Sequence, residues 1–86
     1  MKIIIGARYQ HYKKKTIYVV TGFAHHTEDQ EKLVLYRPEI EPVDLATSYP
    51  EGVVFARPYS QFIEQVESAE GLVNRFDLVD LYEIQK

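Results

Sequence analysis

The strongest strand signal in the chain is the segment TIYVVTGFA, residues 16–24. β-branched and aromatic residues dominate it, and they suit the pleated, half-buried surface of a strand. Both alternate sets of its side chains are largely apolar, which indicates a strand in the middle of a sheet. A second strand-like run, KLVLYR at residues 32–37, follows a seven-residue polar connection. Neighbouring strands of this kind are predicted to pair as an antiparallel hairpin.

The signals after this hairpin are shorter. Prolines at 38, 42 and 50, with Gly52 behind them, predict a long loop over residues 38–52, because proline cannot donate to a strand ladder. Residues 53–57 are predicted to form a third strand that ends at Pro58. Residues 60–66 are predicted to form a short helical turn, with Ser60 as a candidate cap.

The last part of the chain adds a turn and a strand. Residues 68–71, Ser-Ala-Glu-Gly, predict a tight turn, and residues 72–76 predict a further strand. The tail from Asp77 to Lys86 carries enough apolar residues to pack as a last strand or a helical turn, and the pattern does not choose between them. We therefore expect a mostly β fold, a small barrel or roll of about five strands with one short helical turn.

Length and composition limit the other possibilities. With 86 residues, we expect a single domain over 1–86, in which 77–86 is a C-terminal extension. The chain has no cysteine, which excludes a disulfide framework, a thiolate nucleophile and a cysteine zinc site. Its apolar runs are too short for a signal peptide or for the roughly 20 residues that span a bilayer, so we expect a cytoplasmic protein.

Charge is distributed unevenly along the chain. The net charge is −3, yet residues 1–36 carry +3 and residues 37–86 carry −6. The acidic total argues against a protein that coats nucleic acid, but it leaves room for a local basic face.

One polar cluster, AHHTEDQE at residues 24–31, separates the two strands of the hairpin. In an extended segment His26 and Glu28 project to the same side, and Glu31 could fold back toward them. Such a trio could bind a divalent metal or position a water for general base chemistry, although it lacks a third firm ligand at a recognised spacing. The alternative is a structured turn in which His26 bonds to the backbone and Glu28 pairs with an arginine.

Two arginines are expected to need partners. Arg57 stands before a proline, which favours an extended backbone and so fixes the direction of its side chain. Arg75 lies in an apolar segment, where an unpaired guanidinium is costly to bury. The candidate partners are Glu28, Glu31 and Glu64; the result is an internal ion-pair network or, where carboxylates are too few, a pocket for an anion.

Cations and aromatic rings alternate in RYQHYKKK, residues 8–15. Single-stranded nucleic acid is bound in this way, by rings that stack on bases and lysines that meet phosphates. Three successive lysines are equally typical of a solvated hairpin turn, and Tyr9 and Tyr12 could belong to the core or the rim of a barrel. No serine elbow and no glycine-rich phosphate loop is present.

The order of these motifs resembles a bacterial family described as domain of unknown function 1653. The motifs are Gly6, the group Tyr9-x-His11-Tyr12-Lys13, Tyr18, the cluster 24–31, Val34-x-Tyr36, Gly52, the group Phe55-Ala56-Arg57-Pro58, residues 62–64, Val66, Gly71 and Arg75-Phe76. The resemblance covers residues 6–76 and implies a small SH3-like barrel without an established reaction. The chain departs from the family pattern at Lys14, where the family usually has glycine, at Phe55, where it usually has tryptophan, and in its tail beyond Phe76.

These observations lead to three functional hypotheses. The first is a non-enzymatic binding module for nucleic acid, peptide or an anionic ligand. The second is a small metal-assisted hydrolase built on His26, Glu28 and Glu31, and the third is a protein–protein interaction domain that uses exposed strand edges. No cofactor and no catalytic residue is predicted. The candidate binding residues are Tyr9, His11, Tyr12, His26, Glu28, Glu31, Tyr36, Arg57 and Arg75.

Overall fold

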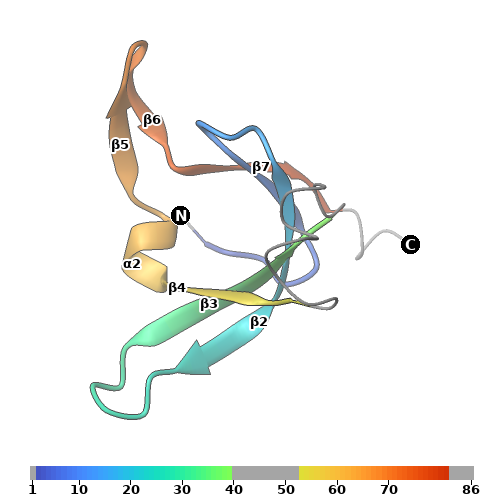
Figure 1. Ribbon diagram of the computed structural model, residues 1–86, viewed down its shortest axis with the longest axis vertical. Coiled ribbons are helices and arrows are strands. Elements are labelled where there is room, and N and C mark those ends of the chain that lie inside the picture. The colour runs from blue at the N-terminus through green and yellow to red at the C-terminus, as the bar shows by residue number, and fades with distance from the viewer. Residues whose placement is uncertain (1, 40–52, 82–86) are drawn as a thin grey trace.

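The computed structural model describes residues 2–39 and 53–81. Within these ranges, strands and one short helix follow one another as β1 (Arg8–His11), β2 (Ile17–His25), β3 (Lys32–Pro38), β4 (Phe55–Pro58), α2 (Tyr59–Phe62), β5 (Gln65–Ser68), β6 (Gly71–Asn74) and β7 (Phe76–Asp80). Five strands form a curled antiparallel sheet in the order β4-β3-β2-β1-β7, and β5 and β6 form a separate hairpin (Figure 1).

The predicted hairpin between the first two runs is confirmed. β2 pairs with β3 in antiparallel register from Tyr18 opposite Pro38 to His25 opposite Lys32. β2 also pairs with β1, so it lies in the interior of the sheet as its apolar composition predicts. In β3 the burial alternates, with Val34 and Tyr36 facing the core.

The strand β4 and the helical turn after it differ in part from the prediction. β4 includes Pro58, which is tolerated because β4 is an outer strand of the sheet. The helical turn is confirmed, but it is α2 at Tyr59–Phe62, and Pro58 occupies the N-cap without a side-chain hydrogen bond. The prediction of Ser60 as the cap is therefore wrong. Of the remaining residues of the predicted turn, Gln65 and Val66 belong to β5.

The strand predicted over 72–76 is divided in two at Arg75. The Arg75 N–H donates to the Glu64 carbonyl, and the Arg75 carbonyl accepts from the Tyr12 N–H; each donor–acceptor distance is 3.0 Å. The bond to Glu64 continues the β5–β6 pairing by one residue, and the bond to Tyr12 brings the chain beside β1, where β7 begins. Residues 77–80 then continue as β7, so the first part of the tail forms a strand.

The turn and loop predictions have different outcomes. The tight turn between β5 and β6 is confirmed, and Gly71 closes it with a φ of +97°, which glycine adopts without strain. Most of the loop predicted over 38–52 lies outside the described residues.

Aromatic rings fill the core. Phe62 and Phe76 stack with centroids 4.1 Å apart and planes 1° apart. The Tyr9 ring meets Phe62 edge-on at 5.5 Å, and the Tyr36 ring contacts both phenylalanines. The mostly β class is thereby confirmed as a small barrel or roll. The SH3-like form stays a prediction.

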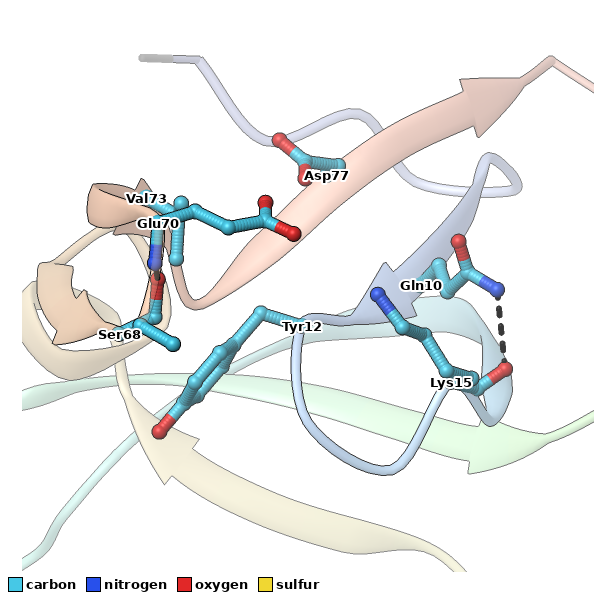
Figure 2. A pocket seen from close by; sticks show the side chains of 8 residues that line it. Gln10, Tyr12, Lys15, Ser68, Glu70, Val73 and Asp77 are labelled. Atoms are coloured by element: carbon cyan, nitrogen blue, oxygen red, sulfur yellow. Dashed lines mark hydrogen bonds between the residues drawn. The ribbon is translucent and has the colours of Figure 1, made fainter.

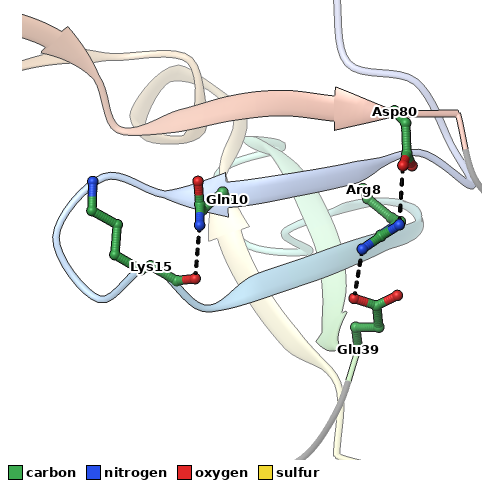
Figure 3. A network of polar contacts seen from close by, with 5 residues as sticks. All are labelled: Arg8, Gln10, Lys15, Glu39 and Asp80. Atoms are coloured by element: carbon green, nitrogen blue, oxygen red, sulfur yellow. Dashed lines mark hydrogen bonds and ion pairs between the residues drawn. The ribbon is translucent and has the colours of Figure 1, made fainter.

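A polar network ties the edge of the sheet together (Figure 3). The Arg8 guanidinium donates to Asp80 Oδ2 of β7 at 3.0 Å and to Glu39 Oε2, just after β3, at 3.1 Å. On the same strand, Gln10 Nε2 donates to the Lys15 carbonyl at 3.0 Å and braces the β1–β2 turn. The Arg8 contacts thus hold one end of β1 and the Gln10 contact braces the lysine-bearing turn at its other end (Figure 3).

Candidate functional site

Arg57 lies on the outer strand β4, opposite Val34 of β3. Its Nε donates to the Tyr36 hydroxyl at 3.1 Å, and its guanidinium carbon lies 5.5 Å from the centroid of the Phe76 ring. The extended backbone expected of a residue before proline is confirmed by its place in β4. The guanidinium is thus held between a hydroxyl and the face of an aromatic ring.

Arg57 has no carboxylate partner among the described residues. Arg75, by contrast, donates from Nη2 to Glu64 Oε1 at 2.8 Å and from Nε to the Gln61 carbonyl at 3.1 Å. The predicted pairing is correct for Arg75 with Glu64 and wrong for Arg57. Because Tyr36 occupies only Nε, the terminal nitrogens of Arg57 still have N–H groups to donate.

His11 is the buried polar residue next to this arginine. Its side chain meets the Phe76 ring edge-on at 5.1 Å, and its Nδ1 accepts from the N–H groups of Lys13 at 3.2 Å and Lys14 at 3.3 Å. A nitrogen that accepts two bonds carries no proton, so in the neutral ring Nε2 bears the hydrogen. Within the described residues, every fully buried side-chain nitrogen of His11 and Arg57 has a hydrogen-bond partner. A nitrogen of theirs without a partner is therefore in contact with solvent. The Nε2–H of His11 is therefore open to a ligand or to water.

Positive charge gathers around His11. Burial lowers the pKa of His11, and the charges of Lys14, Arg57, Arg75 and Lys13 lower it further. These four cations therefore act on one site of the folded protein, although the net charge of the protein is −3. We call His11, Lys13, Lys14, Arg57 and Arg75 the cationic face.

This environment predicts a pH dependence of stability. The pKa of His11 in the folded protein lies below 6.5, its ordinary value in an unfolded chain. At pH values between the folded and the unfolded pKa, unfolding takes up a proton, so the free energy of unfolding falls as the pH drops through that range. Urea unfolding at pH 7.5 and pH 5.5 should show a larger loss for the wild type than for His11→Asn, whose side-chain oxygen can replace Nδ1 as acceptor. The control is His25→Asn, at the exposed end of β2. Equal losses for the wild type and His11→Asn would contradict this expectation.

The three candidate tyrosines have different positions. Tyr9 is 1% exposed and its hydroxyl accepts the Ile4 N–H at 3.0 Å, so it belongs to the core. Tyr36 is buried as well and positions Arg57. Tyr12 is half-buried, with its ring centroid 5.0 Å from that of His11. Of the three, Tyr12 offers a ring at the surface beside the cationic face.

The cluster around His26 forms the exposed turn between β2 and β3, at the opposite end of β2 from the β1–β2 turn (Figure 1). His26 Nδ1 accepts the Glu28 N–H at 3.2 Å, and the His26 N–H donates to the Glu31 carbonyl at 2.8 Å. The turn interpretation of His26 is confirmed. Neither Glu28 nor Glu31 pairs with an arginine among the described residues, so that expectation is wrong.

No group of three or more potential metal ligands occurs in residues 2–39 and 53–81. Arg57 pairs with Val34, which pairs with Phe23 near the His25 end of β2, but no hydrogen bond or ion pair among the described residues joins the exposed turn to Arg57 or Arg75. The structure therefore does not bring His26, Glu28 and Glu31 together with Arg57 and Arg75.

A family model for a protein of unknown function, DUF1653, matches residues 7–78. The chain belongs to this family. A crystal structure of a DUF1653 protein from Bordetella bronchiseptica has the same fold, with a TM-score of 0.68, 24% identity, and coverage of 90% of this chain and 88% of that chain. No curated protein matches significantly.

The DUF1653 match includes the whole cationic face and every strand except the end of β7. In this DUF1653 protein, no helix within the described ranges is long and apolar enough to cross a membrane. The family description names no activity.

Proposed function

We propose that this DUF1653 protein is a non-enzymatic binding module that holds an anionic group on its cationic face. The observation that carries the proposal is the position of Arg57, whose guanidinium lies on the Phe76 ring without a carboxylate partner among the described residues. A partly desolvated guanidinium that is not neutralised within the protein attracts an anion from solution.

The neighbouring groups support an anion at this position. The Nε of Arg57 is bonded to Tyr36, so its remaining donors lie on the two terminal nitrogens, which match the geometry of a carboxylate or phosphate. His11 adds a neutral N–H donor, and Lys13 and Lys14 are exposed on the turn beside it. Because Tyr36 and Phe76 hold Arg57 in place, little side-chain entropy is lost when the anion binds.

The proposal is tested by titrating the protein with pyrophosphate at low salt and following the backbone amide signals by NMR. Charge-assisted hydrogen bonds of about 1.5–3 kcal/mol predict that Arg57→Gln weakens binding roughly tenfold or more. Lys32→Gln is the matched control, because the Lys32 ammonium lies over the rings of Phe23 and Tyr59 and is not part of the cationic face. Arg57→Lys should bind with intermediate affinity, since it keeps the charge but loses the paired donors.

Two results would overturn the proposal. Pyrophosphate could leave the signals of His11, Lys13 and Lys14 unchanged, or Arg57→Gln and Lys32→Gln could weaken binding equally, which would indicate only long-range attraction. Thermal melts of both variants establish that each one is folded before the affinities are compared.

Single-stranded nucleic acid is a second candidate ligand of the same face. The half-buried Tyr12 ring lies directly before the exposed lysines of the β1–β2 turn, which suits a base beside a phosphate. An oligouridine that binds with a steep dependence on salt, and that loses affinity in Lys13→Gln/Lys14→Gln, would favour this ligand. Binding of pyrophosphate alone would favour a small anion.

A further inference from the structure

A pocket lies between the β1–β2 turn and the tip of the β5–β6 hairpin (Figure 2). Its volume is about 220 Å³. Sites for drug-sized ligands have roughly 300–1,000 Å³, and a water takes up about 30 Å³, so the pocket suits a small molecule. Its polar lining residues are Gln10, Tyr12, Lys15, Ser68, Glu70 and Asp77.

Opposite charges face each other across this pocket. Lys15 extends its ammonium from the turn and Glu70 extends its carboxylate from the hairpin tip (Figure 2). Within the described part of the chain, no ion pair joins Lys15 to Glu70 or to Asp77, the other acid of the pocket. Asp77 uses Oδ1 to accept the Asn74 amide at 3.0 Å and keeps a second oxygen. The pocket thus holds one ammonium apart from two carboxylates.

Hydrogen bonds fix the backbone on both sides. Lys15 has a φ of +61°. Its N–H donates to the His11 carbonyl and its carbonyl accepts from Gln10 Nε2, each at a distance of 3.0 Å. On the hairpin, Ser68 Oγ accepts the Glu70 N–H at 3.1 Å and donates to the Gly71 carbonyl at 2.9 Å. Two braced turns keep the charged side chains at the rim of a preformed space, which lowers the entropy cost of binding.

We propose that this pocket binds a small zwitterion of the free amino acid class. The ligand carboxylate meets the Lys15 ammonium, and the ligand ammonium meets Glu70 and Asp77, with the Tyr12 ring as a side wall. A molecule with both charges satisfies both sides of the pocket, whereas a simple anion is repelled by two carboxylates. Neither Arg57 nor His11 lines the pocket, so this inference goes beyond the proposed anion site and does not depend on it.

The test titrates the full chain with L-leucine, with leucine methyl ester, which lacks the carboxylate, and with N-acetyl-leucine, which lacks the ammonium. Leucine should shift the amide signals of Lys15, Glu70 and Asp77, and each blocked derivative should bind at least about tenfold more weakly, as expected when one ion pair is lost. Because the three charges of the pocket sum to −1, free lysine should bind more tightly than free glutamate.

Variants distinguish the pocket from general surface binding. Glu70→Gln should weaken leucine binding about tenfold, and Lys15→Gln should weaken it similarly. The matched control is Glu67→Gln, an exposed acid on the same hairpin outside the pocket, which should leave the affinity unchanged. Arg57→Gln should also leave it unchanged, which separates this result from the test of the anion site.

Three results would overturn the proposal. Leucine could shift no pocket signal in the millimolar range, the two blocked derivatives could bind as well as leucine, or Glu70→Gln could behave like Glu67→Gln. A spectrum of each variant without ligand establishes that it keeps the wild-type fold.

Discussion

Replacing Phe76 with alanine should lower the free energy of unfolding by about 3–5 kcal/mol, the usual cost of truncating a buried aromatic side chain. Phe76 is 1% exposed and stacks on Phe62, and its edges and face contact His11, Tyr18 and Tyr36. A domain of 86 residues has a total stability of only about 4–13 kcal/mol, so this loss could remove most of it.

Chemical denaturation followed by circular dichroism measures this effect. Leu78→Ala is the matched control on the same strand, because Leu78 is 48% exposed and should change stability by no more than about 0.5 kcal/mol. Phe76→Leu, which keeps an apolar side chain, should lie between the two variants. If Phe76→Ala and Leu78→Ala unfold at the same denaturant concentration, Phe76 is not central to the core.

Part of the fold could be predicted from the sequence, because local patterns determine it, and part could not. Residues 16–24 and 32–37 are apolar runs rich in β-branched and aromatic residues that identify an antiparallel hairpin, and local patterning is sufficient there. The division of 72–76 at Arg75 depends on bonds to Glu64 and Tyr12, which are distant in sequence. No local pattern encodes those partners.

The strand β5 was missed for a different reason. In Gln65–Ser68 the side chains alternate between exposed and half-buried, with Val66 as the one apolar residue, so the spacing of Phe62, Ile63 and Val66 favoured a helix. The cross-strand pairing with β6, closed by Gly71, determines the strand conformation instead. Short, half-exposed hairpins carry a weak periodic signal.

The candidate site was predicted in part. His11, Tyr36 and Arg57 are among the candidate binding residues predicted from the sequence, and the structure brings these three together around Phe76. The cluster around His26 is a candidate site in the sequence because its polar residues are adjacent there, yet its side chains bond to the backbone of their own turn. The aromatic support for Arg57 and the pocket beside Glu70 depend on strand order, which single-residue patterns do not contain.

Arg8 is expected to have the next largest effect on stability after Phe76. Its guanidinium joins β1 to Asp80 of β7 and to Glu39 after β3 (Figure 3), and the three side chains are 20%, 40% and 24% exposed. Removing one partner of a fully buried pair costs about 3–5 kcal/mol, and exposed pairs contribute about 0–1 kcal/mol. Partial burial places Arg8→Ala between these limits, at a loss of about 1–3 kcal/mol.

The charge interaction can be separated from packing by a second substitution. Arg8→Ala leaves two carboxylates facing the same space, so Asp80→Asn should destabilise the wild type but restore part of the stability of Arg8→Ala. Arg8→Lys should cost less than Arg8→Ala, because it keeps a charge but cannot donate to both carboxylates in the same way. Denaturation at low and high salt measures the remaining screening, and the loss in Arg8→Ala should shrink as salt rises. Additive effects of Arg8→Ala and Asp80→Asn would contradict a role for this ion-pair network in joining β7 to the sheet.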